Sequence, residues 1–115
     1  MDNNSLKHFY DALSAARAIQ KFITDKTFED YLDDDLLSSG VERKFEIIGE
    51  AFNRICKDSP NDLNVITNYR GIIDFRNVVA PAYDHLEDTL VWGLASNQIH
   101  QLITELEAIE DIELL

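Results

Sequence analysis

Few residues in this chain have types and spacings that could support chemistry. Three histidines, His8, His85 and His100, lie far apart and show none of the short spacings of a metal site. The four glycines are also scattered, which excludes a glycine-rich loop for binding phosphate. We therefore expect no metal and no cofactor.

Cys56 and a pair of glutamates are the next candidates. As the single cysteine, Cys56 cannot form an intramolecular disulfide. It lies near the end of an apolar helical pattern with no histidine at local spacing, and we expect a buried structural thiol. Glu46 and Glu50 are four residues apart on one helix face and could act in acid–base catalysis, but such pairs are more often solvated surface.

The charge is distributed unevenly along the chain. There are 22 acidic and 10 basic residues, a net charge of −12, which argues against general binding to nucleic acid or anionic membranes. Only the section 43–76 is not acidic, and no Lys or Arg follows it. The candidates to meet a phosphate are therefore Arg43, Lys44, Arg54, Lys57, Arg70 and Arg76. For most of them a solvated surface charge is the simpler interpretation.

Three sequence blocks in order carry a family resemblance. Residues 41–51 are VERKFEIIGEA, residues 69–83 are YRGIIDFRNVVAPAY, and residues 90–92 are LVW. Together they resemble the HepT family of HEPN-domain proteins, found in prokaryotic toxin–antitoxin pairs with a minimal nucleotidyltransferase. The EIIGEA block is similar to the family's IGEA helix, and the pair Arg76 and Asn77, followed by Tyr83, is similar to its RNxxxHxY motif.

The resemblance implies a metal-independent ribonuclease that forms a helical homodimer, with two copies of the motif facing each other across a cleft. Arg76 would bind the scissile phosphate through its planar guanidinium, and Asn77 would orient the substrate or neighbouring side chains. The implied partners are RNA and an MntA-like nucleotidyltransferase antitoxin. That antitoxin would silence the toxin by attaching adenylate at Tyr83.

The chain departs from the family motif at Pro81, where the family has its histidine. Proline has no titratable group and no backbone N–H, so it cannot act as a base, and it bends a helix. Either the protein is an inactive homologue that keeps dimer, RNA or partner binding, or the bend brings His85 into the missing role. On a straight helix Arg76 and Tyr83 lie within about 20° of one face, whereas Arg76 and His85 lie about 180° apart. Weak activity from Arg76 and the dimer cleft is a third interpretation.

Two other functions compete with that of a ribonuclease toxin. The protein could be an accessory subunit that binds a nucleotidyltransferase and cleaves nothing. It could also be an acidic helical interaction protein whose charge contacts a basic partner. A nucleotidyltransferase encoded nearby would favour the toxin or the accessory subunit. Binding that weakens steeply with salt would favour the acidic interaction protein.

Helical spacing of apolar residues runs through the first part of the chain. It predicts a helix over 6–23, with Asn4 or Ser5 as its N-cap. Thr27 followed by Asp30 resembles a capping box that opens a second helix. These signals place two helices before the middle of the chain.

The remaining elements are also helical by pattern. The stretch 41–57 predicts a helix, and the weak formers at 38–40 predict a kink or break before it. A turn is expected at 58–62, a further helix from about Tyr69, and one last helix from about Glu87 almost to the end. The sum is a single domain over 1–115, an all-α, four- to five-helix up-and-down bundle of HEPN-like type.

The N-terminal residues Met1–Ser5 are polar, and no apolar run of signal-peptide or membrane-spanning length follows. With one cysteine, the chain must hold its fold by packing alone. We expect a cytoplasmic protein without membrane contact, and a homodimer because the family's site needs two copies of the motif.

Overall fold

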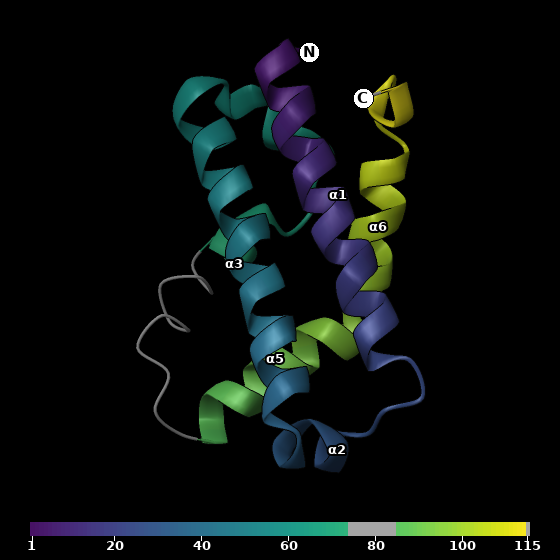
Figure 1. Cartoon of the computed structure of the whole chain (residues 1–115). Helices are drawn as coiled ribbons and strands as arrows, with labels where there is room; N and C mark the ends of the chain where they lie inside the picture. Colours follow the sequence, from purple (N-terminus) through teal and green to yellow (C-terminus); the bar gives the residue numbers. More distant parts are fainter. Residues whose placement is uncertain (74–84, 115) are drawn as a thin grey trace.

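A computed structural model describes residues 1–73 and 85–114 (Figure 1). The helices are α1 (Asn3–Ile23), α2 (Phe28–Asp33), α3 (Asp35–Asp58), η1 (Pro60–Val65), α5 (His85–Asn97), α6 (Ile99–Glu107) and η2 (Ile112–Leu114). Residues 69–73 are helical as well. No strand occurs in these two ranges, so the all-α prediction is confirmed. Within the same ranges no helix is both long enough and apolar enough to span a membrane.

The long helices α1 and α3 run antiparallel and form the main packing layer (Figure 1). Helix α6 lies along the other side of α1, and α5 crosses the bundle near the end where α3 begins. The N-terminus and the C-terminal turn lie together at the opposite end. The chain therefore folds as a helical bundle in which one helix is set across the others.

The core lies between α1, α3 and α6 because each helix carries one apolar stripe. The stripe of α1 includes Phe9, Leu13, Ala16 and Ile19, that of α3 includes Phe45, Ile48, Phe52 and Ile55, and that of α6 includes Leu102, Ile103 and Leu106. The rings of Phe9 and Phe52 meet edge to face, with centroids 6.0 Å apart. Each large side chain removed from water stabilises the fold by about 1.5–3 kcal/mol.

The predicted capping box at the start of α2 is confirmed. The Asp30 backbone N–H donates to Thr27 Oγ1 at 3.1 Å, and the Thr27 backbone N–H donates to Asp30 Oδ2 at 2.9 Å. At α1 the N-cap is Asp2 instead of Asn4 or Ser5, because the Asp2 carboxylate accepts from the Asn4 N–H at 3.0 Å. A carboxylate at the positive end of a helix is favoured by the helix dipole.

Of the kink or break predicted near 38–40, the break is wrong, because α3 runs through these residues without interruption. The chain breaks earlier, at Asp34, whose Oδ1 accepts from the N–H groups of Leu36 and Leu37 at 3.0 and 3.1 Å. This cap starts the helix early enough to carry the weak formers. Gly40 also lies close to α1, since an added Cβ would be 3.3 Å from the Phe22 ring, a tight contact.

The single last helix predicted from Glu87 is divided in the structure. Helix α5 ends at Asn97, Gln98 has non-ideal backbone angles (φ −119°, ψ −16°), and α6 then sets off along α1. A second change of direction comes at Asp111, whose φ is 69°, before η2. The apolar spacing continues across Gln98, so the pattern alone could not show the change of direction.

Candidate functional site

The residues of the family-like motif fall in the part of the chain that the structure leaves out. Those outside the described residues are Arg76, Asn77, Pro81 and Tyr83. His85 is described only as the first residue of α5, and its side chain lies outside the description as well. The structure therefore shows the two segments that flank the motif, residues 66–73 before it and α5 after it.

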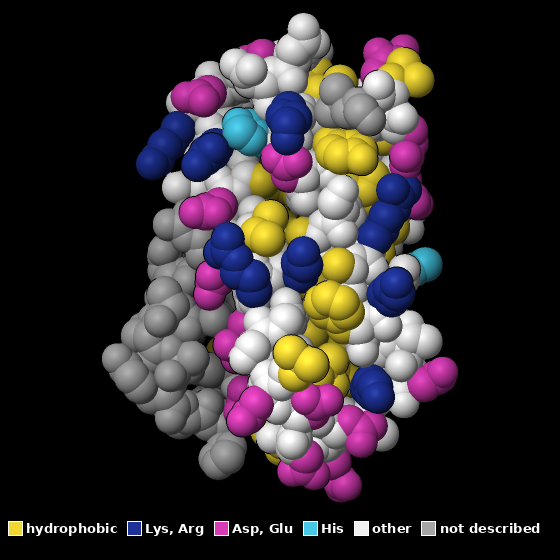
Figure 2. Space-filling model, in the orientation of Figure 1, with side chains coloured by type: hydrophobic (Ala, Val, Ile, Leu, Met, Phe, Trp, Pro, Cys, Tyr) yellow, Lys and Arg dark blue, Asp and Glu magenta, His cyan; other side chains and the backbone are white. Residues whose placement is uncertain are grey.

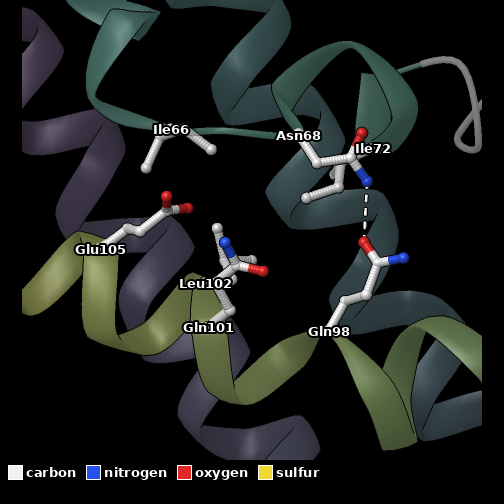
Figure 3. Close-up of a pocket in the computed structure, with 7 residues that line it drawn as sticks. All are labelled: Ile66, Asn68, Ile72, Gln98, Gln101, Leu102 and Glu105. Atoms are coloured by element: carbon white, nitrogen blue, oxygen red, sulfur yellow. Dashed lines mark hydrogen bonds between the residues drawn. The ribbon is translucent and has the colours of Figure 1, made fainter.

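The segment before the motif is held by two polar side chains, Gln98 at the junction of α5 and α6 and Glu105 on α6 (Figure 3). The Asn68 amide donates from Nδ2 to Gln98 Oε1 at 2.8 Å. One residue earlier, the Thr67 N–H donates to the Glu105 carboxylate at 3.2 Å, and the Thr67 hydroxyl makes a short hydrogen bond to the same group. We call these four residues the polar clamp. Three of them, Asn68, Gln98 and Glu105, line a small cavity of about 20 Å³ with Ile66, Ile72, Gln101 and Leu102.

Gly71 is required by the polar clamp. A Cβ at this position would lie 2.6 Å from Asn68 Oδ1 and 3.0 Å from Nδ2, closer than side chains approach in folded proteins. Any other residue would therefore require the Asn68 amide or its surroundings to shift. The glycine therefore lets the helix at 69–73 start directly against the polar clamp.

The segment after the motif is held by an aromatic cluster. On α5, the Trp92 ring lies 5.6 Å from that of Tyr31 and 6.4 Å from that of Phe28, both on α2. Tyr31 is fully buried. The short helix α2 thus fixes α5, which follows directly from the motif.

Two carboxylates affect the pKa of the Tyr31 hydroxyl in this aromatic cluster. Burial raises the pKa of the Tyr31 hydroxyl, and the negative charges of Glu42 on α3 and Asp88 on α5 raise it further. Within residues 1–73 and 85–114 the hydroxyl has no hydrogen-bond partner. Glu42 belongs to the 41–51 block that carries the resemblance, and Asp88 lies in the first turn of α5. Carboxylates at this place can orient a guanidinium or accept a proton.

The basic candidates for a phosphate contact are spread over the surface. Four of them are on α3, namely Arg43, Lys44, Arg54 and Lys57. Figure 2 shows Lys and Arg side chains distributed over the face formed by α1 and α3. Arg43 donates to Glu46 at 3.2 Å, and Arg70 lies over the Tyr69 ring at 5.4 Å. The five described candidates therefore form a dispersed basic face and not a single deep cleft, and Arg76 lies outside the described residues.

The other candidates behave as surface residues. His8 lines a polar groove of about 120 Å³ with Asp11, Glu50 and Arg54, and His100 is exposed. Glu46 pairs with Arg43, so the Glu46 and Glu50 carboxylates are solvated surface groups, as the simpler interpretation predicted. In the part of the chain that is described, no group of three or more His, Cys, Asp or Glu side chains could hold a metal ion.

The prediction that Cys56 is buried is wrong, because its side chain is exposed. Each residue turns the helix by about 100°, so the position after the buried Ile55 faces outward. The thiol therefore makes no contribution to the core.

Comparison with known proteins gives a consistent result. Residues 12–109 match the family described as "Ribonuclease HepT-like". "Putative RNase MJ0127" of Methanocaldococcus jannaschii is 30% identical over 105 residues, covering 90% of this chain and 86% of the relative. "Putative RNase MJ0125" of the same organism is 29% identical, covering 98% of each chain. No solved structure matches this chain significantly.

The family match includes α3, the polar clamp and α5, which are the elements that flank the motif. The helical architecture agrees with the HEPN-like fold that the resemblance implies. Because the match spans most of its length, this chain belongs to the HepT-like ribonuclease family.

Proposed function

We propose that this protein is a metal-independent ribonuclease, the toxin of a toxin–antitoxin pair. The observation that supports the proposal most is the family match over residues 12–109, to which the relatives named as RNases add. Arg76 would stabilise the negative charge that develops on the scissile phosphate, and Asn77 would orient the ribose. RNA would approach over the basic side chains of α3, which partly offset the net charge of the molecule.

His85 is the proposed base, because Pro81 leaves the motif without its histidine. A base must take the proton of the ribose 2′-hydroxyl before that oxygen can attack the phosphorus. His85 opens α5, nine residues after Arg76, so a change of direction between them is required for both to face one substrate. The proline supplies a reason for such a change.

The proposal includes two partners. The first is a second copy of this chain, which would bring a second motif to the cleft. The second is an MntA-like nucleotidyltransferase, which would attach adenylate to Tyr83 and so add charge and bulk at the cleft. Pro81 favours one alternative, a homologue that binds this nucleotidyltransferase but no longer cleaves RNA.

The test compares cleavage of total RNA and tRNA in EDTA by the wild type and by single variants. We expect cleavage by the wild type, a loss of about 10²-fold or more in Arg76→Ala, and a comparable loss in His85→Ala. Arg17→Ala is the matched control, because Arg17 is paired with Glu107 and Glu113 on the surface.

Each outcome selects an interpretation. Cleavage that survives His85→Ala would remove His85 from the mechanism. Cleavage by Pro81→His alone would establish the binding subunit instead. Sedimentation as a monomer at micromolar concentration would contradict the proposed homodimer. The modification site is tested separately, since Tyr83→Phe should abolish adenylation by a cognate nucleotidyltransferase.

A further inference from the structure

An open hollow of about 410 Å³ lies where α1 ends and α3 begins. It is lined by Phe22, Asp34, Leu36, Leu37 and Gly40. One wall is the half-buried ring of Phe22 on α1, and the other is the N-cap and first turns of α3. The hollow is formed entirely by described residues and contains none of the family-like motif.

Leu36 makes this hollow unusual for a surface feature. Its side chain is 85% exposed, although it lies on a well-capped helix with apolar neighbours. Single exposed apolar residues are common, and Leu90 at 53% on α5 is an example. Here three large apolar side chains instead share one concave surface, which is typical of a binding site.

Gly40 keeps the hollow open. It lies one turn after Leu36 and Leu37, and its missing side chain leaves the Phe22 ring accessible. An added Cβ would contact that ring at 3.3 and 3.6 Å. The hollow therefore depends on this glycine, and a single methyl group should reduce it.

The rim of the hollow is acidic. Asp33, Asp34 and Asp35 are consecutive and exposed, and none of them forms an ion pair with another described residue. Residues 21–35 hold six acidic and two basic side chains, Lys21 and Lys26, a net charge of −4. Figure 2 shows acidic side chains around apolar ones at this end of the molecule. Such a rim repels phosphates and attracts Lys and Arg.

We propose that this hollow is a docking site for a segment of a partner protein that carries an apolar side chain flanked by Lys or Arg. The apolar side chain would pack among Phe22, Leu36 and Leu37. The flanking cations would face Asp33 and Asp35, while Asp34 remains the cap of α3. Apolar burial gives the affinity, and the charges give the association rate and its dependence on salt. This interaction is independent of the ribonuclease activity proposed above.

The test uses two synthetic amphipathic helical peptides as probes. Both carry the same leucine stripe, but one has lysines and the other glutamates on its polar face. Each is titrated into the ¹⁵N-labelled full chain, and backbone amide shifts are followed by NMR. We expect the lysine peptide to shift the amides of Leu36, Leu37 and Gly40 and to bind at least about tenfold more tightly than the glutamate peptide.

Matched variants separate docking from general attraction to an acidic protein. Leu36→Gln should weaken binding at least about tenfold, whereas Leu90→Gln, an equal change on α5, should leave it unchanged. Gly40→Ala should weaken binding while Gly93→Ala should not, because an added Cβ at Gly93 meets no atom within 4 Å. Replacing Asp33 and Asp35 with Asn should reduce the preference for the lysine peptide.

Four results would overturn the proposal. In the first, the shifted amides lie on another surface. In the second, Leu36→Gln and Leu90→Gln bind equally well. In the third, an RNA oligonucleotide shifts the same amides. In the fourth, the protein self-associates through the hollow and Leu36→Gln abolishes that association, which would make the occupant a second copy. The RNA cleavage assay is read separately, so either proposal can fail without the other.

Discussion

The side chains of Asn68 and Gln98 are joined by a hydrogen bond of 2.8 Å, although 30 residues separate them in the chain. Asn68 precedes the helix that leads into the family-like motif, and Gln98 is the junction between α5 and α6. One bond therefore connects the segment that enters the motif with the helix pair that follows it (Figure 3).

Gly71→Ala should break this bond. The new methyl group would displace the Asn68 amide, so we expect the free energy of unfolding to fall by about 1 kcal/mol despite the better helix propensity of Ala. Urea denaturation measures this change. Gly93→Ala is the control, and it should stabilise the protein by up to about 1 kcal/mol because its methyl group meets nothing. Equal effects at the two glycines would contradict the close contact at Gly71.

Tyr31→Phe should remove a buried hydroxyl that has no partner among the described residues. We expect the free energy of unfolding at neutral pH to rise by about 1 kcal/mol, because the cost of burying an unpaired polar group disappears. Thermal or urea unfolding measures this, with Tyr10→Phe as the control at a half-buried tyrosine. A destabilised Tyr31→Phe variant would show that the hydroxyl is bonded in solution.

The same tyrosine predicts a dependence on alkaline pH. Its pKa is raised in the folded state, so the unfolded chain loses this proton first as the pH rises above the ordinary value of 10.0. The wild type should therefore lose stability from about pH 10 upward, and Tyr31→Phe should lose less. Identical alkaline profiles of the two proteins would refute the assignment.

Asp30→Asn should change the acid limb of the stability profile. The hydrogen bonds with Thr27 lower the pKa of Asp30 below its ordinary value of 3.8. The ionised Asp30 carboxylate therefore contributes to the free energy of unfolding above pH 3.8. This contribution is lost as the pH falls through the lowered pKa of the folded state. Unfolding followed between neutral pH and pH 2 should show a shallower acid slope in Asp30→Asn. An acid slope equal to that of the wild type would contradict the role of this carboxylate in the capping box.

Arg17→Gln should loosen the C-terminal turn from α1. The guanidinium donates to Glu107 at 2.7 Å and to Glu113 at 2.6 Å, and these carboxylates raise the pKa of Arg17. Because the pairs are solvated, the loss of stability should be below about 1 kcal/mol and should disappear at high salt. Hydrogen exchange of the amides near Ile112 reports the effect locally, and no salt dependence would argue against ion pairing.

Much of the fold could be predicted from short-range pattern. The apolar spacing located α1 and most of α3, and the pair Thr27 and Asp30 located the start of α2. The start of α3 was placed too late, because a side-chain cap at Asp34 outweighs the weak propensity of 38–40. Local spacing describes which face of a helix is buried, and capping decides where that helix begins.

The division of α5 from α6 could not be predicted, because it depends on a partner far away in sequence. The apolar pattern is continuous there, and only the fold brings Asn68 to Gln98. For the same reason the polar clamp and the carboxylates near Tyr31 were not candidates. The resemblance located the motif itself, but its geometry lies outside the described residues, so the roles of Arg76, Asn77, Tyr83 and His85 stay predictions.

The position of the two chain ends has a practical consequence. Both lie at the end of the bundle opposite α2, so a fluorescent protein or an affinity tag fused at either terminus would stand well away from the hollow. Such fusions can be immobilised with the hollow facing the solution.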